Sequence, residues 1–502
     1  MGKGNSKKWI NYGMFSYIVL FTLYSFVGRI LPLYLLIGEK INGYIFILFA
    51  SMGSVLVVLD FLNEKWLFKG QYCAILYLFI GIMILSSIVN IKYGYMDNLK
   101  TIVWQVIQIA IFFSAYTRIG KEKMFQFLKV YFSMVGWIWT IAVVYSLKQF
   151  VVLDSYSVEL WEGHFRFQGF SGRRLYGVFN DPNFAAVTSL YVIYMFIFLA
   201  HCTKKKIIKL IYYSVSMLNV LYIILSGSRT ALVCATVSVV IFLIMWLKNY
   251  FIGDKKAVRF LKRLFVILAL IYMCVCAWWG LNKVLPYIPD IYMKNIIEKN
   301  QMEEQKVAEA QETKNEIESD GESQKLLEEK SKLEKAQQVI TYDKDTYLKR
   351  PDVVKENISN NRIQIWRNYL KGIKGSYFLG ASPRNIEKYM EENNPEIFEQ
   401  NNGYETHNGF VSLFAGTGIV GSIIIFIYMM LVGKDVIKVY LNNKIDWEFA
   451  SLFTIICIII IYSCFFTELF FVNNLTTSLF WLLLGAVMYW LEEKKTKITG
   501  GC

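Results

Sequence analysis

Long apolar runs recur along the 502-residue chain and are separated by shorter polar segments. About twelve of these runs contain roughly 18 to 25 residues, the length that a helix needs to cross about 30 Å of hydrocarbon. Each run is predicted to be a helix, because lipid offers the backbone no other hydrogen-bond partner. The predicted spans are roughly 10–31, 42–62, 71–92, 99–117, 124–147, 183–201, 206–226, 229–249, 260–280, 408–433, 448–471 and 474–491.

The composition supports an all-α integral membrane protein. The chain is 55% hydrophobic and 17% aromatic, with a mean hydropathy of +0.38, which is more apolar surface than a soluble protein of this length needs. The start, "MGKGNSKKWINYGMF", places a basic flank before a full-length span. It is therefore interpreted as a membrane anchor and not as a cleaved signal peptide.

The net charge of +14 raises the question of nucleic-acid binding. Lys and Arg, however, concentrate in every second loop between the predicted spans. The positive-inside rule then places both termini in the cytoplasm, and contact with anionic lipid accounts for the excess charge. The basic segments are Lys7 and Lys8, Lys65 and Lys69, Arg118 to Lys123, "HCTKKKIIK", "KNYFIGDKKAVRFLKR", Lys434 to Lys444, and "EEKKTK".

Two outer loops are longer than the other connections. The first covers about 148–182, within the nine spans of residues 1–280, and the second covers 281–407. Residues 408–502 form the last three spans. The eight cysteines lie in spans, inner loops or the tail, and 281–407 contains none, so the sequence predicts neither a disulfide framework nor a CxxC metal site.

The second outer loop has two parts of different composition. Residues 293–341 are charged and lack aromatic side chains, so we expect a solvated helix or disorder there. Residues 350–407 contain aromatic residues again. Ile363, Trp366 and Leu370 recur at helical spacing, which predicts a helical part that packs against the membrane domain.

Several arginines fall on the predicted outer side, against the charge rule. Arg229 lies in the turn "LSGSRTAL" between spans seven and eight, and Arg362 lies on the predicted loop helix. Arg173 and Arg174 precede span six, which begins near Asn183. The alternatives are a snorkelling arginine at position 229, a helix-entry motif with chance basic residues before span six, and a solvated helix charge at position 362.

His407 is one of three histidines in the chain, and it stands with Asn408 at the start of span ten. Glu405, two residues earlier, is a candidate to orient the imidazole ring. The alternative is an interfacial histidine with no function. The other two histidines, His164 and His201, are interpreted as a loop residue and an inner-face flank.

These residue types suit the transfer of a group from a pyrophosphate. Arginines bind phosphate through paired donors, and the start of span ten adds the positive end of a helix. That positive end disfavours the charged form of a nearby histidine, and a neutral imidazole can accept a proton from a hydroxyl. No cofactor or metal need be invoked if arginines carry the charge of the leaving group. Only "YDKDTY", with Asp343 and Asp345, resembles a metal motif.

Four motifs occur in a characteristic order between about 170 and 430: "GVFNDPNFAA", "LSGSRTAL", "RIQIWRNYLKGIKGSYFLG" and "THNGFVSLFAGTGIVG". In this order they resemble the O-antigen ligase and polymerase superfamily, whose members use undecaprenyl-pyrophosphate glycans. The resemblance implies that Arg229 and Arg362 bind the pyrophosphate and that His407 is catalytic. It also implies metal-independent, inverting glycosyl transfer on a GT-C-like fold.

One position departs from the motifs of this superfamily. The chain reads "LGASPRN", with Ser382 where the superfamily often has a second glycine. The shape of this loop is therefore open. Arg384 follows in the same loop and is included among the candidate substrate-binding residues, with Arg173, Arg174, Asn183, Glu405 and Asn408.

The motifs do not separate polymerases from ligases. Abundant Ile, Lys, Asn and Tyr suggest an AT-rich genome such as that of many Gram-positive bacteria, which favours a repeat-unit polymerase for capsule or exopolysaccharide in the bacterial cytoplasmic membrane. The expected partners are a lipid-linked donor and acceptor, with a chain-length regulator or other assembly proteins. A ligase is the first alternative. A flippase and a purely structural membrane partner are the others, and the nearly uncharged spans argue against a flippase.

Overall fold

The computed structural model describes residues 3–161, 164–171, 173–250, 255–289, 291–292, 294, 361–401 and 405–499. Within these residues, ten helices are long and apolar enough to cross a membrane. Two further apolar helices, Cys73–Val89 and Trp447–Ser463, have 17 residues each. The predicted class, an all-α integral membrane protein, is confirmed. The total of twelve spans stays a prediction, although each predicted span coincides with one of these helices.

The elements follow one another along the chain with short connections, apart from the segments that lie outside the described residues. They are α1 (Lys3–Val27), α2 (Leu31–Ile37), α3 (Glu39–Glu64), α4 (Cys73–Val89), η1 (Ile91–Tyr93), α5 (Met96–Ile107), η2 (Gln108–Phe112), η3 (Phe113–Thr117), α6 (Lys121–Val151), β1 (Tyr156–Trp161), β2 (His164–Ser171), β3 (Arg174–Gly177), α7 (Pro182–Cys202), α8 (Lys206–Leu225), α9 (Arg229–Leu247), α10 (Lys256–Val284), η4 (Leu285–Tyr287), α14 (Arg362–Gly372), α15 (Ile386–Asn393), α16 (Pro395–Asn401), α17 (Gly409–Asn442), α18 (Trp447–Ser463) and α19 (Leu475–Thr499).

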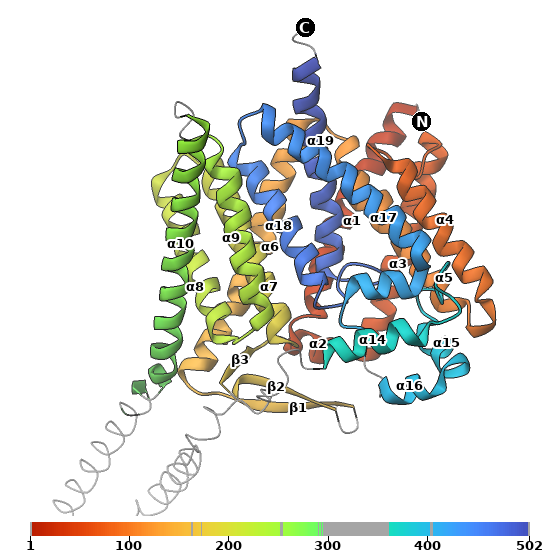
Figure 1. Ribbon diagram of the computed structural model, residues 1–502, viewed down its shortest axis with the longest axis horizontal. Helices are drawn as coiled ribbons and strands as arrows, with labels where there is room; N and C mark the ends of the chain where they lie inside the picture. The colour runs from red at the N-terminus through yellow and green to blue at the C-terminus, as the bar shows by residue number, and fades with distance from the viewer. Residues whose placement is uncertain are drawn as a thin grey trace, which may run out of the picture.

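The long helices form a bundle with two distinct faces (Figure 1). The start of α1 and the end of α19 lie on one side, called here the termini face. The strands β1–β3 and the helices α14–α16 lie on the other side, called here the loop face. The apolar windows of α7 and α19 are 83% and 89% buried, so these two helices occupy the centre of the bundle, whereas that of α10 is 0% buried.

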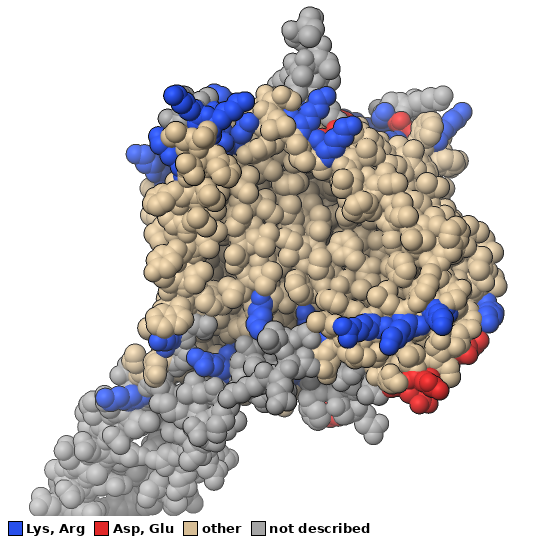
Figure 2. Space-filling view, in the orientation of Figure 1, with Lys and Arg blue, Asp and Glu red and all other residues tan. Residues whose placement is uncertain are grey.

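The charges follow this division of the molecule. Lys and Arg gather along the termini face, and a second band of them lies over α14 and α15 on the loop face (Figure 2). The first group agrees with the predicted cytoplasmic position of the termini, since basic loops stay on that side of a membrane. The second group lies over helices that belong to the predicted outer loop 281–407.

A three-stranded antiparallel sheet occupies most of the predicted outer loop 148–182. Tyr156 pairs with Gln168 across β1 and β2, and Gly169 pairs with Gly177 across β2 and β3. The hydropathy pattern predicts only a connection here, because three short strands leave no long apolar run. An isolated bridge between Ile30 and Phe179 attaches the end of this segment to the turn between α1 and α2.

The helix α17 is interrupted at Gly418, where φ is +64° and ψ is −167°. The loop that follows α14 enters the break. The backbone N–H of Ile419 donates to the carbonyl of Tyr377 at 2.8 Å, and that of Ala381 donates to the carbonyl of Ala415 at 2.8 Å. A Cβ at Gly418 would lie 2.3 Å from the Phe378 carbonyl oxygen. The loop after α14 is therefore bonded directly to the backbone of α17.

The helices α14 to α16 share a separate small core on the loop face. Ile365, Tyr369 and Ile373 form its stripe on and just beyond α14, and they pack with residues of α15. The sequence predicted that Ile363, Trp366 and Leu370 would form the buried stripe of this helix. That prediction is wrong for Ile363 and Leu370, whose side chains are 50% and 40% exposed. Both stripes have helical spacing, and only the packing of α15 and α16 distinguishes them.

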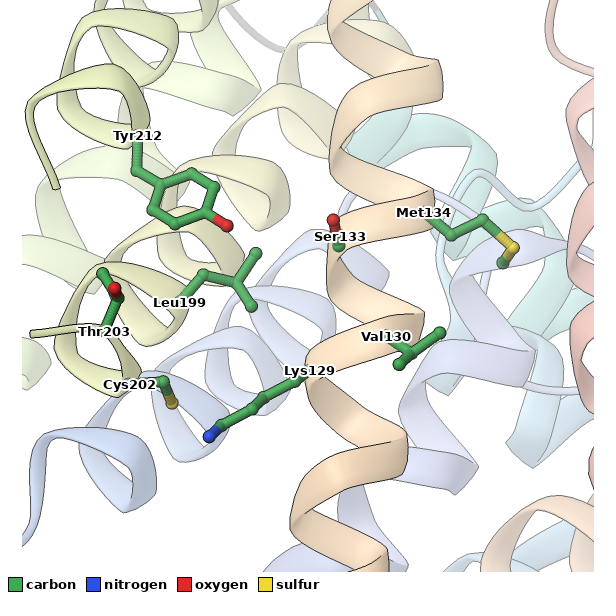
Figure 3. Close-up of a pocket in the computed structure, with 8 residues that line it drawn as sticks. All are labelled: Lys129, Val130, Ser133, Met134, Leu199, Cys202, Thr203 and Tyr212. Atoms are coloured by element: carbon green, nitrogen blue, oxygen red, sulfur yellow. The ribbon is translucent and has the colours of Figure 1, made fainter. Parts of the chain in front are cut away.

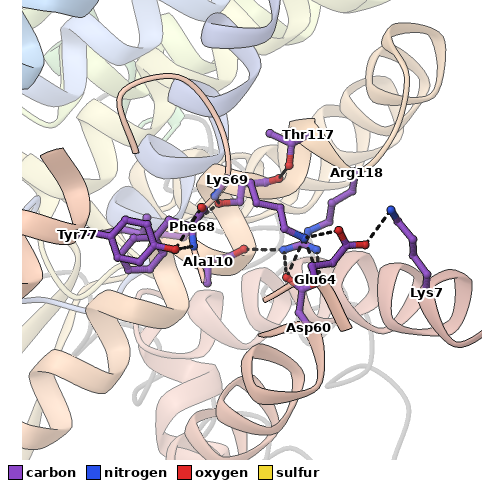
Figure 4. A network of polar contacts seen from close by, with 11 residues as sticks. Lys7, Asp60, Glu64, Phe68, Lys69, Tyr77, Ala110, Thr117 and Arg118 are labelled. Carbon is purple, nitrogen blue, oxygen red and sulfur yellow. Dashed lines mark hydrogen bonds and ion pairs between the residues drawn. The ribbon is translucent and has the colours of Figure 1, made fainter. Parts of the chain in front are cut away.

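A charged network ties α1, α3 and the end of η3 together at the termini face (Figure 4). The two guanidinium nitrogens of Arg118 donate to the two carboxylate oxygens of Asp60 at 2.7 and 3.0 Å. These two side chains are only 3% and 6% exposed. Lys69 lies 3.3 Å from the same carboxylate, and Lys7 pairs with Glu64 at 2.8 Å.

Gly418→Ala should destabilise the protein, because an alanine is strained at this φ and ψ and its methyl group collides with the Phe378 carbonyl. We expect the free energy of unfolding to fall by about 2 kcal/mol or more, measured by thermal unfolding in detergent. Gly433→Ala is the matched control, since Gly433 lies on the same helix and an added Cβ there meets nothing within 4 Å. Equal unfolding temperatures for the two variants would contradict this account of the break.

Asp60→Ala should leave the buried Arg118 guanidinium without its carboxylate. Breaking such a pair from one side costs about 3–5 kcal/mol, so the unfolding temperature in detergent should fall markedly. Asp97→Ala serves for comparison, because it removes the solvent-exposed pair of Asp97 with Lys100. A change no larger than that of Asp97→Ala would show that the network has no structural role.

Candidate active site

His407 lies in a tight turn directly before α17, and its backbone has a left-handed φ of +45°. Thr406 on one side of it is buried. The Thr406 carbonyl accepts a hydrogen bond from the indole N–H of Trp366 at 3.0 Å, and its hydroxyl lies 2.9 Å from that of Thr467. Trp366 belongs to α14, so this contact fixes the loop helix against the residue that precedes the histidine.

Asn408 on the other side caps α17. Its side-chain oxygen accepts hydrogen bonds from the backbone N–H groups of Phe410 and Val411 at 2.9 and 3.1 Å. Its side-chain nitrogen donates to the carbonyl of Cys464 at 2.9 Å. Both amide atoms of Asn408 are thus engaged within the protein and cap the helix, while its contact with a substrate stays a prediction. Asparagine is among the preferred residues at this position of a helix.

Phe466 connects the histidine to the first candidate arginine. The guanidinium of Arg362, at the start of α14, lies over the Phe466 ring with 4.7 Å between the guanidinium carbon and the ring centroid. The ring of His407 lies edge-on to the same ring, with 6.3 Å between centroids. A cation over an aromatic face is favourable, so Phe466 holds Arg362 on the side of the site where His407 stands.

Electrostatic effects link three of the predicted residues. Burial and the positive charge of Arg362 lower the pKa of His407, while the negative charges of Glu405 and Asp181 raise it less. Burial also lowers the pKa of Arg362, and the charge of Arg229 adds to this effect. Arg362 therefore acts on both His407 and Arg229, although these residues come from three separate segments of the chain. The charged form of the His407 imidazole is therefore disfavoured by burial and by the neighbouring Arg362 cation.

The start of α7 forms the neighbouring part of the site. Asp181 caps the helix and accepts from the N–H groups of Asn183 and Phe184 at 2.7 and 2.9 Å. Arg174 donates to the side-chain oxygen of Asn183 at 2.8 Å and to the Ser226 carbonyl at 3.0 Å. Two predicted residues thus bind each other, and together they join α7 to the turn before Arg229.

Sequence reasoning missed an ion pair at this face. Arg29 donates to the carboxylate of Glu468 at 2.7 Å, and the two side chains are 17% and 13% exposed. The Arg29 guanidinium lies 3.5 Å above the Phe184 ring, and Asn474 donates to the same carboxylate oxygen at 2.6 Å. Burial raises the pKa of Glu468, and Arg29 opposes this. An arginine inside an apolar run was the available signal, since the predicted first span included position 29.

The remaining candidates lie farther from these contacts or at the surface. Arg173 is exposed in the turn between β2 and β3, and Glu405 is exposed next to His407. Arg384 donates to the Thr101 hydroxyl of α5 at 3.2 Å and to the Phe471 carbonyl at 3.1 Å. Arg384 thus joins the loop before α15 to α5 and to the connection between α18 and α19.

In the part of the chain that the structure describes, no group of three or more His, Cys, Asp or Glu side chains could hold a metal ion. Asp343 and Asp345, the metal-like pair of the sequence, lie outside the described residues, as do most of the charged segment 293–341 and the side chain of His164.

The fold and this arrangement define a class: a multi-pass membrane protein with a cluster of arginines and a histidine at one face. Residues 214–426 match the family described as O-antigen ligase. The match spans Arg229, Arg362 and His407, and it supports the O-antigen ligase and polymerase superfamily that the motifs predicted, so this prediction is confirmed. Members of that family are enzymes of the membrane glycosyltransferase type. No curated protein matches the chain.

His407 should titrate below the usual histidine pKa and be neutral at pH 7, because burial and Arg362 disfavour its charged form. Arg362→Gln should raise its pKa, and Glu405→Gln should lower it further. An NMR titration of the isotope-labelled protein in detergent measures the pKa of His407 in each variant. The His407 signal is assigned from its loss on substitution. Arg367→Gln, an exposed charge on the same helix, is the control. A pKa of His407 that does not respond to Arg362→Gln would contradict the geometry.

Proposed function

We propose that this protein polymerises lipid-linked oligosaccharide repeat units of the undecaprenyl-pyrophosphate type by inverting glycosyl transfer at its loop face. The proposal is supported by the electrostatic influence of Arg229 on Arg362 and of Arg362 on His407, with all three residues inside the segment that matches the family. Cations and a neutral base are the groups that a pyrophosphate leaving group and an attacking hydroxyl require.

The pyrophosphate of the donor binds between Arg229 and Arg362. The helices α7, α9, α14 and α17 all begin at this face, and helix N-termini attract anions through their free N–H groups and macrodipoles. Phe466 limits the movement of the Arg362 guanidinium. These groups stabilise the charge that develops on the leaving oxygen as the glycosidic bond to the lipid pyrophosphate breaks.

The terminal hydroxyl of the next lipid-linked repeat attacks the anomeric carbon of the growing chain. His407 accepts the hydroxyl proton, a new glycosidic bond forms with inversion, and the lipid pyrophosphate departs with its negative charge held by the arginines. Because only the neutral imidazole accepts a proton, activity should fall as the pH falls through the lowered pKa of His407. No metal ion is needed for these steps.

The proposed setting is the bacterial cytoplasmic membrane, with the termini face in the cytoplasm and the loop face outside. The concentration of Lys and Arg on the termini face supports this orientation. In this arrangement the strands β1–β3 and the helices α14–α16 face a donor and an acceptor that are both displayed on the outer leaflet. The end products are then capsular or exocellular polysaccharides.

A ligase is the second candidate, because the matching family is itself described as O-antigen ligase. A ligase uses the same donor, base and arginines, but it transfers the finished glycan to a different acceptor. The two activities differ in the intermediate that accumulates when the site is inactivated.

Cells carrying His407→Ala at the native locus should accumulate single lipid-linked repeats, because polymerisation stops before the first transfer. Loss of a general base slows such a step about 10²- to 10⁴-fold. Arg362→Gln should act in the same direction, whereas Arg367→Gln on the same helix should not. Gel electrophoresis of the glycans and mass spectrometry of the lipid extract measure both species.

His201→Phe provides the matched histidine control, since it retains a ring to stack on Trp447 near the termini face. Immunoblotting of membranes checks that every variant is inserted at the same level. Long polymer retained on the lipid carrier in the His407→Ala strain would identify a ligase. Polymer of normal length on its normal acceptor would refute both activities.

A further inference from the structure

A groove of about 520 Å³ opens between α6, α7 and α8, on the side of the bundle nearer the termini face (Figure 3). Val130 and Leu199 supply its apolar walls, and Val130 is 68% exposed. Lys129, Ser133, Thr203 and Tyr212 contribute an amine and three hydroxyl groups. The groove therefore combines a hydrocarbon surface with a small polar end, and the candidate active site does not include it.

The polar end lies at the depth of the lipid headgroups. The helix α6 has 31 residues, so it is about 46 Å long and exceeds the hydrocarbon layer by about 8 Å at each end when centred in it. Lys129 lies about 12 Å from the start of α6, which is about 4 Å inside the boundary. A lysine at this depth extends its amine to the interface.

Lys129 lacks a carboxylate partner within the described residues: no ion pair between them includes it, and its amine lies 4.5 Å from the centroid of the Phe125 ring. The adjoining turn adds three exposed lysines, Lys204 to Lys206. Figure 3 shows the Lys129 amine beside Cys202, with the Tyr212 hydroxyl pointing toward α6. Glu448, a carboxylate that acts on Cys202 together with Lys129, is outnumbered by these four lysines, so the charge at this end of the groove is positive on balance.

We propose that this groove binds one anionic glycerophospholipid of the leaflet on the termini side. The phosphate accepts hydrogen bonds from Lys129 and from the hydroxyls of Ser133 and Thr203, and an acyl chain lies along Val130 and Leu199. The positive charge selects an anionic headgroup over a zwitterionic one, and the apolar walls favour a lipid over free phosphate. The bound lipid fills the space between three helices, of which α7 carries Asp181 and Asn183 at its other end.

The probe for this site is a phosphatidylglycerol with one palmitoyl and one oleoyl chain, titrated onto the purified full-length protein and counted by native mass spectrometry. Phosphatidylcholine with the same chains is the comparison lipid. The wild-type protein should bind one phosphatidylglycerol more tightly than any phosphatidylcholine. Lys129→Gln should weaken this binding about fivefold, the effect of one cation near a membrane surface.

Ser133→Phe tests the space in the groove without a change of charge, and it should reduce phosphatidylglycerol and phosphatidylcholine binding together. Lys123→Gln is the control, because Lys123 is an exposed lysine on the same helix and does not line the groove. Gel filtration and thermal unfolding show that each variant is folded. The proposal fails if Lys129→Gln and Lys123→Gln bind phosphatidylglycerol alike, if the two lipids bind equally to the wild type, or if decaprenyl phosphate displaces the lipid at equal concentration.

Discussion

The contact between the broken helix α17 and the loop that follows α14 determines the geometry of the candidate site. Gly418 takes a conformation that only glycine adopts easily, and the backbone of residues 377–381 bonds to both sides of the break. This attachment holds the far end of α14, while the bond from Trp366 to Thr406 holds its middle. With α14 fixed at two points, Arg362 cannot move away from His407 without loss of these bonds.

The loop face keeps its charges partly buried, and this changes what they can do. In the pair of Arg29 and Glu468, each charge is compensated by the other, and the Phe184 ring covers the guanidinium. Burial disfavours the charged form of Arg362; the charges of Tyr462 and Asp181 oppose this, and the positive charge of Arg229 adds to it. A partly buried cation is costly in an apolar setting, and an anionic ligand lowers that cost. The positive charge of Arg362 also disfavours the charged form of His407.

The two faces of the bundle use arginine in different ways. At the termini face, Arg118 meets Asp60 with two hydrogen bonds and is almost fully buried, so the pair closes the packing between α3 and η3. At the loop face, Arg174 bonds an amide oxygen and a backbone carbonyl. These bonds join the end of the sheet to α7 and to the turn before Arg229.

The sequence alone determined the class and the positions of the apolar helices, because hydropathy acts along the chain. The order of motifs also indicated the superfamily that residues 214–426 support. Only the tertiary structure decided which side of α14 is buried, because the stripe that contains Ile363 and the stripe that contains Ile365 both repeat at helical spacing. It also showed Arg29 with Glu468, Asn408 as a cap, and the sheet before α7. These features depend on contacts between residues far apart in the chain, which local patterns do not encode.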